Sequence, residues 1–402
     1  MESKSYYENI YQVNYDCGMK YVQQSNLPEA KSAFQKAGNA LLKLVEMTYG
    51  VEREKYKSKL KSIIEIVEKI NAKMKEPVVH QPVGTNTKPE APKSEVSEDG
   101  INYVVNGVNV KDFLANEAND PVTFDDVKGM EKEKALIQRE FFLTKEQREF
   151  NESIGKKPKT FILLYGVPGT GKTFFAKAIS EELKNRLGGD VPFFSVVGSQ
   201  LSDCKVGATE KNIQAVFEFC KQFEHCVLFI DEFDTVAPDR KQANGDPTAG
   251  SRVTVLLQMM DGFNSSKGTL VIAATNCPYN LDGAVLSRAN TRIEIPLPSY
   301  EVVYAVVKSK IGKILADDVD LSMLAARLAK NGYSNRDIKN FIENMKDSLS
   351  DEFAKSQAKG HIKPISEYRY TNEMVERAFK EIVPTTKQSD IQRIEQFKNS
   401  GE

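Results

Sequence analysis

A glycine-rich segment at residues 166–173, G-V-P-G-T-G-K-T, limits the possible folds of this chain more than any other feature. It follows the apolar run F-I-L-L and precedes the helix-prone stretch F-F-A-K-A-I-S-E-E-L-K-N. The apolar run has the length and composition of a buried parallel strand. Glycines let successive backbone N–H groups point at one anion, and the start of a helix adds the positive end of its dipole. The segment therefore predicts a phosphate-binding P-loop, and a glycine turn without a ligand is the weaker alternative.

The P-loop predicts ATP and Mg²⁺ as cofactors. In the pattern G-x-x-x-x-G-K-[ST], the lysine reaches the β- and γ-phosphates and the hydroxyl residue binds Mg²⁺. Lys172 and Thr173 occupy these two positions. The residues expected to contact the nucleotide are consecutive along the loop and the helix that follows: Val167, Pro168, Gly169, Thr170, Gly171, Lys172, Thr173 and Phe174.

The chain after residue 121 alternates apolar strand candidates with helical stretches. This alternation predicts an α/β fold of the P-loop type, with a doubly wound parallel sheet. After Pro298 the pattern becomes helical, which predicts a small α-helical lid subdomain. The strand candidates are residues 160–165, 192–197, 226–230, 269–274 and 292–295, and the later helices are 300–315, 320–330, 334–356 and 371–381.

The first 118 residues have a different character. Residues 5–24, 27–48 and 51–74 predict three helices, and the apolar residues of the third recur at helical spacing. Residues 76–99 contain four prolines and little to bury, which is typical of a flexible tether. Asn106-Gly107 is a hairpin turn signal. We expect a three-helix bundle at 1–75, a linker with a short hairpin at 76–118, an α/β ATPase subdomain at 119–298, and the lid with a C-terminal helix at 299–402.

Two adjacent carboxylates end the third strand candidate, in the sequence V-L-F-I-D-E-F-D at residues 227–234. Mg²⁺ prefers carboxylate partners and keeps several of its waters, so Asp231 is the expected metal ligand. Glu232 is the candidate general base that orients the attacking water. A surface Asp-Glu pair after a buried strand is the alternative, but it is improbable at this distance from a P-loop.

A polar residue and two arginines complete the candidate catalytic set. Asn276 ends the fourth strand candidate, where its amide can bind the attacking water or the γ-phosphate. An asparagine at such a position is otherwise a turn residue. Arginine is suited to neutralising phosphoryl charge in the transition state, so Arg288 and Arg292 are candidate fingers supplied to a neighbouring subunit. Ordinary surface arginines are the alternative for either one.

Composition restricts the cellular setting. The formal net charge is −1, so no basic field recruits nucleic acid or an acidic membrane, and we expect membrane contact to be indirect at most. The five cysteines form no C-x-x-C pair, which favours reduced thiols over metal sites or disulfides. The polar start lacks a signal-peptide core, and no apolar run reaches the ~18 residues of a membrane span. These features predict a soluble cytoplasmic protein.

Together the motifs resemble the AAA ATPase module. The resemblance covers residues 119–345 and rests on Y-G-V-P-G-T-G-K-T, F-I-D-E-F-D, A-A-T-N and the stretch from Arg288 to Pro298. Residues 124–130, with Val127 and Gly129, resemble the family's adenine-contacting segment, and residues 332–338 resemble its lid motif. The resemblance implies a ring, usually a hexamer, with ATP at subunit interfaces and substrate at a central pore.

The N-terminal helices resemble the MIT (microtubule-interacting and trafficking) domain, with an unrelated three-helix bundle as the alternative. An MIT domain, a linker and one AAA module also occur together in katanin, spastin and the ATPase that disassembles ESCRT-III. This resemblance implies that residues 1–75 recruit a protein substrate or adaptor.

Three positions depart from the AAA pattern. Lys205 stands where the first pore loop usually has an aromatic residue, and lysine grips an extended polypeptide less well. Thr291 stands where relatives often keep an arginine, which favours Arg288 as the finger. Asn335 and Arg336 stand in the lid motif in place of the usual pair of small residues. Arg336 either points at the γ-phosphate, like the sensor-2 arginine of other AAA+ branches, or is exposed to solvent.

The sequence therefore predicts a homo-oligomeric ATP hydrolase that remodels a protein partner recruited by residues 1–75. A regulatory or scaffold ATPase that threads no polypeptide is the competing class, and Lys205 keeps it open. A nucleic-acid remodelling enzyme is disfavoured by the near-neutral charge and by the lack of a recognisable reading module.

Overall fold

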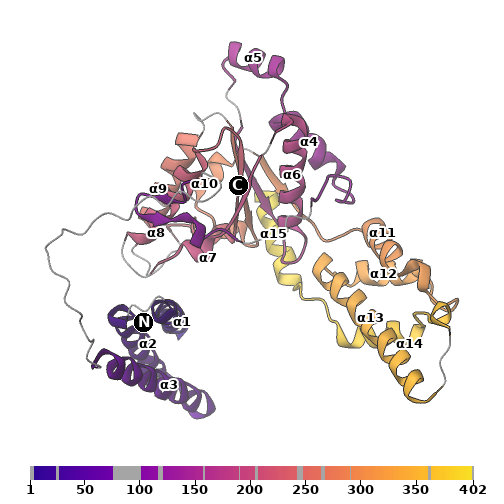
Figure 1. Cartoon of the computed structure of the whole chain (residues 1–402), viewed down its shortest axis with the longest axis horizontal. Coiled ribbons are helices and arrows are strands. Elements are labelled where there is room, and N and C mark those ends of the chain that lie inside the picture. The colour runs from indigo at the N-terminus through magenta and orange to yellow at the C-terminus, as the bar shows by residue number, and fades with distance from the viewer. Residues whose placement is uncertain are drawn as a thin grey trace. The chain divides into compact units, whose positions relative to one another are not determined.

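The computed structural model describes residues 4–23, 27–75, 101–115, 121–156, 159–189, 191–203, 207–241, 248–263, 268–289, 291–360 and 364–400. The chain forms two compact units (Figure 1). The first comprises Met1–Glu95 with Ser202–Thr209, and the second comprises Val96–Leu201 with Glu210–Glu402.

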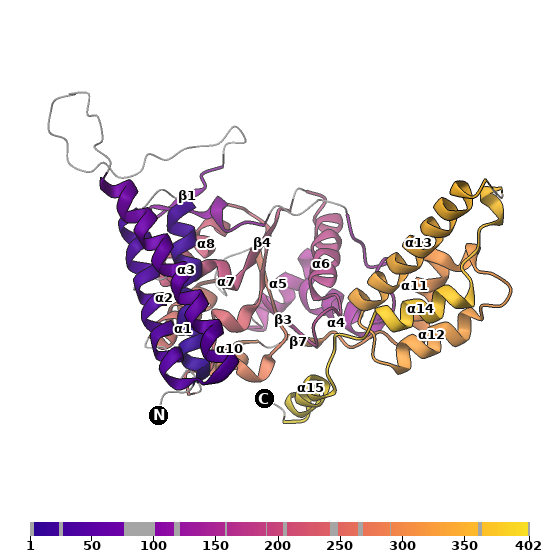
Figure 2. The ribbon, with the colours of Figure 1, turned by 90° about the horizontal axis from the view of Figure 1, so that it is seen from below.

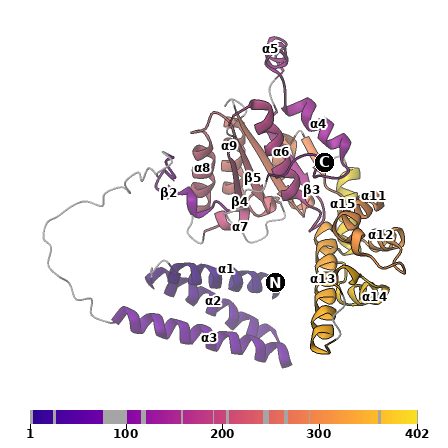
Figure 3. The same cartoon turned by 45° about the vertical axis from the view of Figure 1, so that its right-hand side comes forward.

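The first unit contains the three predicted helices, α1 (Lys4–Gln23), α2 (Leu27–Met47) and α3 (Gly50–Lys75), which lie side by side (Figures 1 and 3). Helix α2 supplies most of the core at helical spacing, and α3 adds Tyr56, Ile63 and Ile70. Helix α1 approaches closely at Gly18, where a Cβ atom would lie 2.8 Å from the Phe34 ring. The core residues of α2 are Ala30, Ala33, Phe34, Ala37, Leu41 and Leu44.

The second unit is built on a five-stranded sheet, as the sequence predicts. All its neighbouring strands are parallel, in the order β4-β5-β6-β3-β7. The strands coincide with the five candidates to within one or two residues at each end. They are β3 (Phe161–Tyr165), β4 (Phe193–Val197), β5 (Cys226–Asp231), β6 (Thr269–Thr275) and β7 (Thr291–Glu294).

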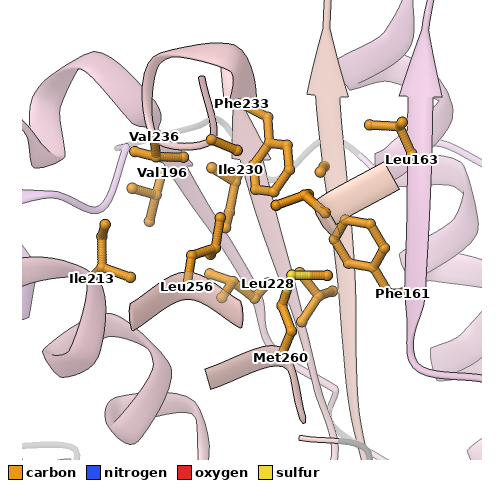
Figure 4. Packing of buried hydrophobic residues seen from close by; sticks show 14 of the residues in the cluster. Phe161, Leu163, Val196, Ile213, Leu228, Ile230, Phe233, Val236, Leu256 and Met260 are labelled. Atoms are coloured by element: carbon orange, nitrogen blue, oxygen red, sulfur yellow. The ribbon is translucent and has the colours of Figure 1, made fainter. Parts of the chain in front are cut away.

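Helices cover both faces of this sheet, which explains why its strands are apolar without alternation. Phe161 and Leu163 of β3 point into the core beneath α8 (Ala208–Cys220), α9 (Ala249–Phe263) and α10 (Gly283–Arg288). Ile162 and Leu164 point to the other core, with α4 (Glu131–Phe141) and α6 (Lys172–Leu187). Figure 4 shows the first core, where Leu256 and Met260 of α9 face Leu228 and Phe161.

A small hairpin precedes the sheet, at the predicted Asn106-Gly107 turn. Strands β1 (Val104–Val105) and β2 (Val108–Asn109) pair antiparallel, and both turn residues have positive φ. Val110 and Phe113 are buried in the first core, and the Ala115 N–H donates to the Ser195 carbonyl oxygen at 2.8 Å. The hairpin is therefore docked on the α/β core. The linker residues 76–100 lie outside the described part of the chain.

The predicted lid helices form their own apolar core (Figure 2). They are α11 (Tyr300–Ile311), α12 (Leu321–Lys330), α13 (Asn335–Ala358) and α14 (Asn372–Glu381). Helices α5 (Lys145–Ser153) and α7 (Gly198–Leu201) are not anticipated from the sequence, whereas α15 (Gln388–Ser400) is a helix at the C-terminal end of the region where a C-terminal helix is expected without stated bounds. Ile394 and Phe397 of α15 pack in the first core of the sheet, away from the lid core. Among the helices described, none has the length and apolarity that crossing a membrane requires.

Candidate nucleotide-binding site

The candidate site lies at the carboxyl edge of the parallel sheet. Strands β3, β5 and β6 end at Tyr165, Asp231 and Thr275, and their parallel register brings these ends to the same edge. Ligands of open α/β sheets bind at this edge. The P-loop, residues 166–171, connects β3 to α6 here.

The P-loop glycines are required by both conformation and space. Gly166, Gly169 and Gly171 have φ values of +152°, +80° and +100°, which side chains rarely adopt. A Cβ atom on Gly166 would lie 2.3 Å from the Ile295 carbonyl oxygen, and one on Gly169 would lie 2.5 Å from the Ser334 hydroxyl. The loop is therefore packed between the chain after β7 and the residue before α13.

Lys172 lies in the first turn of α6 and is 7% exposed. Its ammonium donates to the carbonyl oxygens of Gly166 (2.9 Å) and Val167 (3.1 Å) and to Oδ1 of Asn276 (2.6 Å). Burial lowers the pKa of Lys172 to about 8, although the nearby Asp231 charge opposes this shift. All three acceptors are neutral, so the buried cation suits an anionic ligand such as a phosphate.

Thr173 and Asp231, the two residues predicted to bind Mg²⁺, lie side by side. The Thr173 hydroxyl donates to Oδ2 of Asp231 at 3.4 Å, and Oδ1 of Asp231 accepts from the Glu232 N–H at 2.8 Å. One hydroxyl and one carboxylate fit a Mg²⁺ ion that keeps most of its waters. The described residues contain no cluster of three or more His, Cys, Asp or Glu side chains placed to hold a metal. A water-rich Mg²⁺ site does not need such a cluster.

Glu232 is held in an uncommon conformation directly after β5. Its φ of +50° is in the left-handed region, and its carboxylate accepts a hydrogen bond from the Ser199 hydroxyl at 2.6 Å. A Cβ atom on Gly198 would lie 2.6 Å from the Glu232 carbonyl oxygen, so α7 packs tightly on this turn. Gly198 and Ser199 belong to no motif, and only the pairing of β4 with β5 reveals that they lie beside Glu232.

Asn276 lies between the P-loop and the Asp231 turn, because β6 is the strand between β3 and β5. The preceding Thr275 is fully buried, and its hydroxyl donates to Asp234 at 2.5 Å and accepts from the Cys277 N–H at 2.9 Å. These bonds fix the backbone on both sides of Asn276. The structure thus brings Asn276 and Lys172 together at the position expected from the motif.

The two candidate finger arginines have different surroundings. Arg288 ends α10 and pairs through two nitrogen atoms with Asp261 of α9, at 2.8 Å each. Arg292 donates to the carbonyl oxygens of Leu286 (2.6 Å) and Ala289 (3.1 Å), so it caps the C-terminal end of α10. Their catalytic roles stay predictions. No sequence pattern predicts the capping contacts of Arg292, since they depend on how β7 follows α10.

The lid motif contacts the P-loop, and the expected adenine segment packs in the core that helix α6 shares. Val127 is buried, with its carbonyl oxygen accepting from the Lys134 ammonium at 2.6 Å, and Gly129 has φ +75°. The Arg336 N–H donates to the Gly169 carbonyl oxygen at 3.1 Å, and the Asn335 amide donates to that of Thr170 at 2.8 Å.

The remaining predicted positions differ in their exposure to solvent and in whether the structure describes them. Phe174 is 44% exposed beside the loop, while Val167 is buried and accepts from the Thr170 hydroxyl at 3.0 Å. Pro168 lies in the loop itself. Lys205, at the pore-loop position, falls outside the described residues.

Comparison with known proteins identifies the family of this module. Residues 162–297 match the family model described as ATPase family associated with various cellular activities (AAA). These residues are an AAA ATPase domain. The five-stranded parallel sheet with its P-loop lies largely within the matched residues.

Relatives of the AAA ATPase domain occur in all three domains of life. The ATP-dependent zinc metalloprotease FtsH of Aquifex aeolicus is 38% identical over 232 residues, which are 56% of this chain and 35% of that protein. The cell division cycle protein 48 homolog of Archaeoglobus fulgidus is 33% identical over 289 residues (69% and 37%). The metalloprotease YME1L of Drosophila melanogaster is 34% identical over 223 residues (55% and 29%).

The chain spans between 29% and 37% of the length of these relatives. The family match begins at residue 162, so the MIT-like character of residues 1–75 stays a prediction.

Proposed function

We propose that this chain is a ring-forming AAA ATPase that couples ATP hydrolysis to the remodelling of a protein partner. The observation that carries the proposal is the set of groups at the carboxyl edge of the sheet. This set comprises the buried Lys172 with its neutral acceptors, including Asn276, and the hydroxyl–carboxylate pair of Thr173 and Asp231. The exposed Glu232 completes it. Positioning and charge neutralisation are what phosphoryl transfer needs from a protein.

In the proposed mechanism the P-loop N–H groups and Lys172 bind the β- and γ-phosphates. Thr173 and Asp231 would hold Mg²⁺, which would supply positive charge to neutralise the phosphates. Glu232 orients the attacking water and accepts its proton, after its carboxylate gives up the hydrogen bond from Ser199. Asn276, held against Lys172, positions the same water or the γ-phosphate.

A neighbouring subunit is proposed to complete each site. Arg288 is one-third exposed, and its partner Asp261 is more than half exposed. Exposed ion pairs contribute little, so the arginine can exchange Asp261 for a phosphate without a large cost. Arg292 is the weaker candidate because its guanidinium already binds two backbone carbonyl groups. We assign Arg336 to the γ-phosphate of its own subunit, since its backbone contacts the P-loop at Gly169.

The partner is proposed to be a protein bound by residues 1–75, and the ring is proposed to be a hexamer. The names of several relatives describe zinc metalloproteases, but these 402 residues contain no H-E-x-x-H zinc motif, so we do not extend that activity to this chain. Cys220, Cys226 and Cys277 are free thiols, which supports a reducing compartment such as the cytoplasm.

The scaffold ATPase remains the second candidate, because Lys205 replaces the pore-loop aromatic residue. Lys205→Ala separates the two functions in an assay of partner remodelling. A slower reaction with unchanged ATP turnover supports threading, and an unchanged reaction supports the scaffold function.

Glu232→Gln tests the proposed activity. We expect the variant to bind Mg·ATP as wild type does, to assemble with it, and to lose phosphate release. Glu224→Gln is the matched control, since this carboxylate is 93% exposed in a turn of the same domain. Its turnover should equal that of wild type. An unchanged hydrolysis rate in Glu232→Gln would remove Glu232 from its role, and a pull-down on this variant would recover the partner.

A further inference from the structure

The chain after α14 returns from the lid to the sheet and ends in α15 (Figures 1 and 2). We call residues 382–400 the C-terminal strap. The lid is joined to the α/β core a first time by the residues between β7 and α11, and the strap is a second connection. A segment with both ends fixed limits how far the lid can move relative to the core.

The lid end of the strap is bound to the lid motif. The Tyr333 hydroxyl donates to the Ile382 carbonyl oxygen at 2.5 Å. The Thr385 hydroxyl donates to Oδ1 of Asp337 at 2.9 Å, and its N–H donates to Oδ2 at 3.3 Å. Asp337 is 1% exposed, so its carboxylate depends on protein donors for its hydrogen bonds.

The other end of the strap is bound beside the nucleotide site. The Phe397 ring packs edge-on against Tyr165, the last residue of β3, with centroids 5.3 Å apart. The Lys398 ammonium pairs with Glu294, the last residue of β7, at 2.7 Å. The strap is therefore anchored to the end of β3, which leads into the P-loop, and to the end of the neighbouring strand β7.

The carboxylate of Asp337 links the strap to the P-loop. It accepts from the N–H and hydroxyl of Ser334 at 3.0 and 2.8 Å, which fixes the first turn of α13. That turn carries Asn335, whose amide donates to the Thr170 carbonyl oxygen in the P-loop. The contacts run from Thr385 through Asp337 to Asn335 and Thr170.

We propose that Thr385 is a positioning residue for nucleotide binding. Thr385 holds the Asp337 carboxylate and thereby fixes the position of the α13 N-terminus against the P-loop. That position in turn determines the affinity for Mg·nucleotide. Thr385 itself is exposed and touches no P-loop residue in the described contacts. The inference rests on the proposed nucleotide site being used.

Thr385→Val, Thr385→Ser and wild type, as full chains, test the proposal by titration with fluorescently labelled Mg·ADP. A hydrogen bond to a buried carboxylate changes an equilibrium by about tenfold. We therefore expect Thr385→Val to weaken binding about three- to tenfold, and Thr385→Ser to restore it. Arg377→Ala, which breaks an exposed ion pair on α14, is the lid control and should bind as wild type does.

A double-mutant cycle with Asn335→Ala distinguishes positioning from loss of stability. If Thr385 acts through the α13 turn, Thr385→Val has a smaller effect once Asn335 is gone, because only the Arg336 N–H then still bonds that turn to the P-loop. Three results would overturn the inference: equal affinities of Thr385→Val and wild type, a loss shared by Thr385→Ser, or an undiminished effect of Thr385→Val in the Asn335→Ala background. Tyr333→Phe, which releases Ile382, gives an independent second variant with the same expected loss. Failure of wild type to bind nucleotide would instead refute the proposed function.

Discussion

Raising the pH should weaken nucleotide binding, because the P-loop lysine loses its proton at a much lower pH than an ordinary lysine. Burial lowers the pKa of Lys172 to about 8 in the free protein. A bound phosphate supplies the anion that its three neutral acceptors lack, so the pKa in the complex is higher. Above pH 8 the free lysine is neutral while the bound lysine keeps its proton. Binding then takes up a proton, and affinity falls as pH rises.

The magnitude follows from the titration of one group. The dissociation constant rises by the factor 1 + 10^(pH − pKa), which is about 1.3 at pH 7.5 and about 11 at pH 9 for a pKa of about 8. Binding should therefore weaken roughly eightfold between these values, or by about 1.2 kcal/mol. The nucleotide itself contributes no slope, because phosphate groups with a second pKa near ~6 are already ionised at pH 7.5.

The assay is a titration of labelled Mg·ADP at constant ionic strength from pH 7.5 to 9.5. Lys172→Arg is the control, because a guanidinium stays charged throughout this range. It should bind more weakly but without the slope. Calorimetry at pH 8 in buffers of different ionisation enthalpy should show uptake of about half a proton per nucleotide. A flat wild-type profile, or the same slope in Lys172→Arg, would refute the reasoning.

Three further predictions follow from the geometry. Gly166→Ala should abolish nucleotide binding and lower the melting temperature, because its Cβ atom would lie 2.3 Å from the Ile295 carbonyl oxygen; normal binding would contradict this packing. Phe229→Ala should lower the free energy of unfolding by about 3–5 kcal/mol in urea titrations, since the ring is fully buried; a loss below ~1 kcal/mol would contradict it. Ser199→Ala should change kcat and leave KM unchanged, because it releases Glu232; an effect on KM alone would place Ser199 in binding.

The sheet is predictable from sequence because its strands are buried on both faces. Runs such as F-I-L-L-Y and C-V-L-F-I-D need no knowledge of their neighbours to be recognised as parallel strands. The packing of helix α15 escapes this reasoning, since the helix is short and polar apart from Ile391, Ile394 and Phe397. The surface those residues pack on is formed by segments more than a hundred positions earlier, so no local pattern identifies it.

The same distinction applies to the site. Lys172, Asp231 and Asn276 can be placed from sequence, because each follows or ends a strand and parallel strands share one carboxyl edge. Ser199 and Asn335 cannot, since each contacts the site from a segment whose position depends on tertiary packing. A serine after a strand and an asparagine in a helix cap are ordinary residues until that packing is known.

Mixing subunits of Arg288→Ala with subunits of Glu232→Gln tests the central claim most directly, namely that ATP is cleaved between neighbouring copies of this chain. Each variant alone should release little or no phosphate. In the mixture, an intact Arg288 from one subunit meets an intact Glu232 in the next, so phosphate release should recover and should pass through a maximum near equal proportions. A mixture that stays as inactive as its two components would contradict the claim.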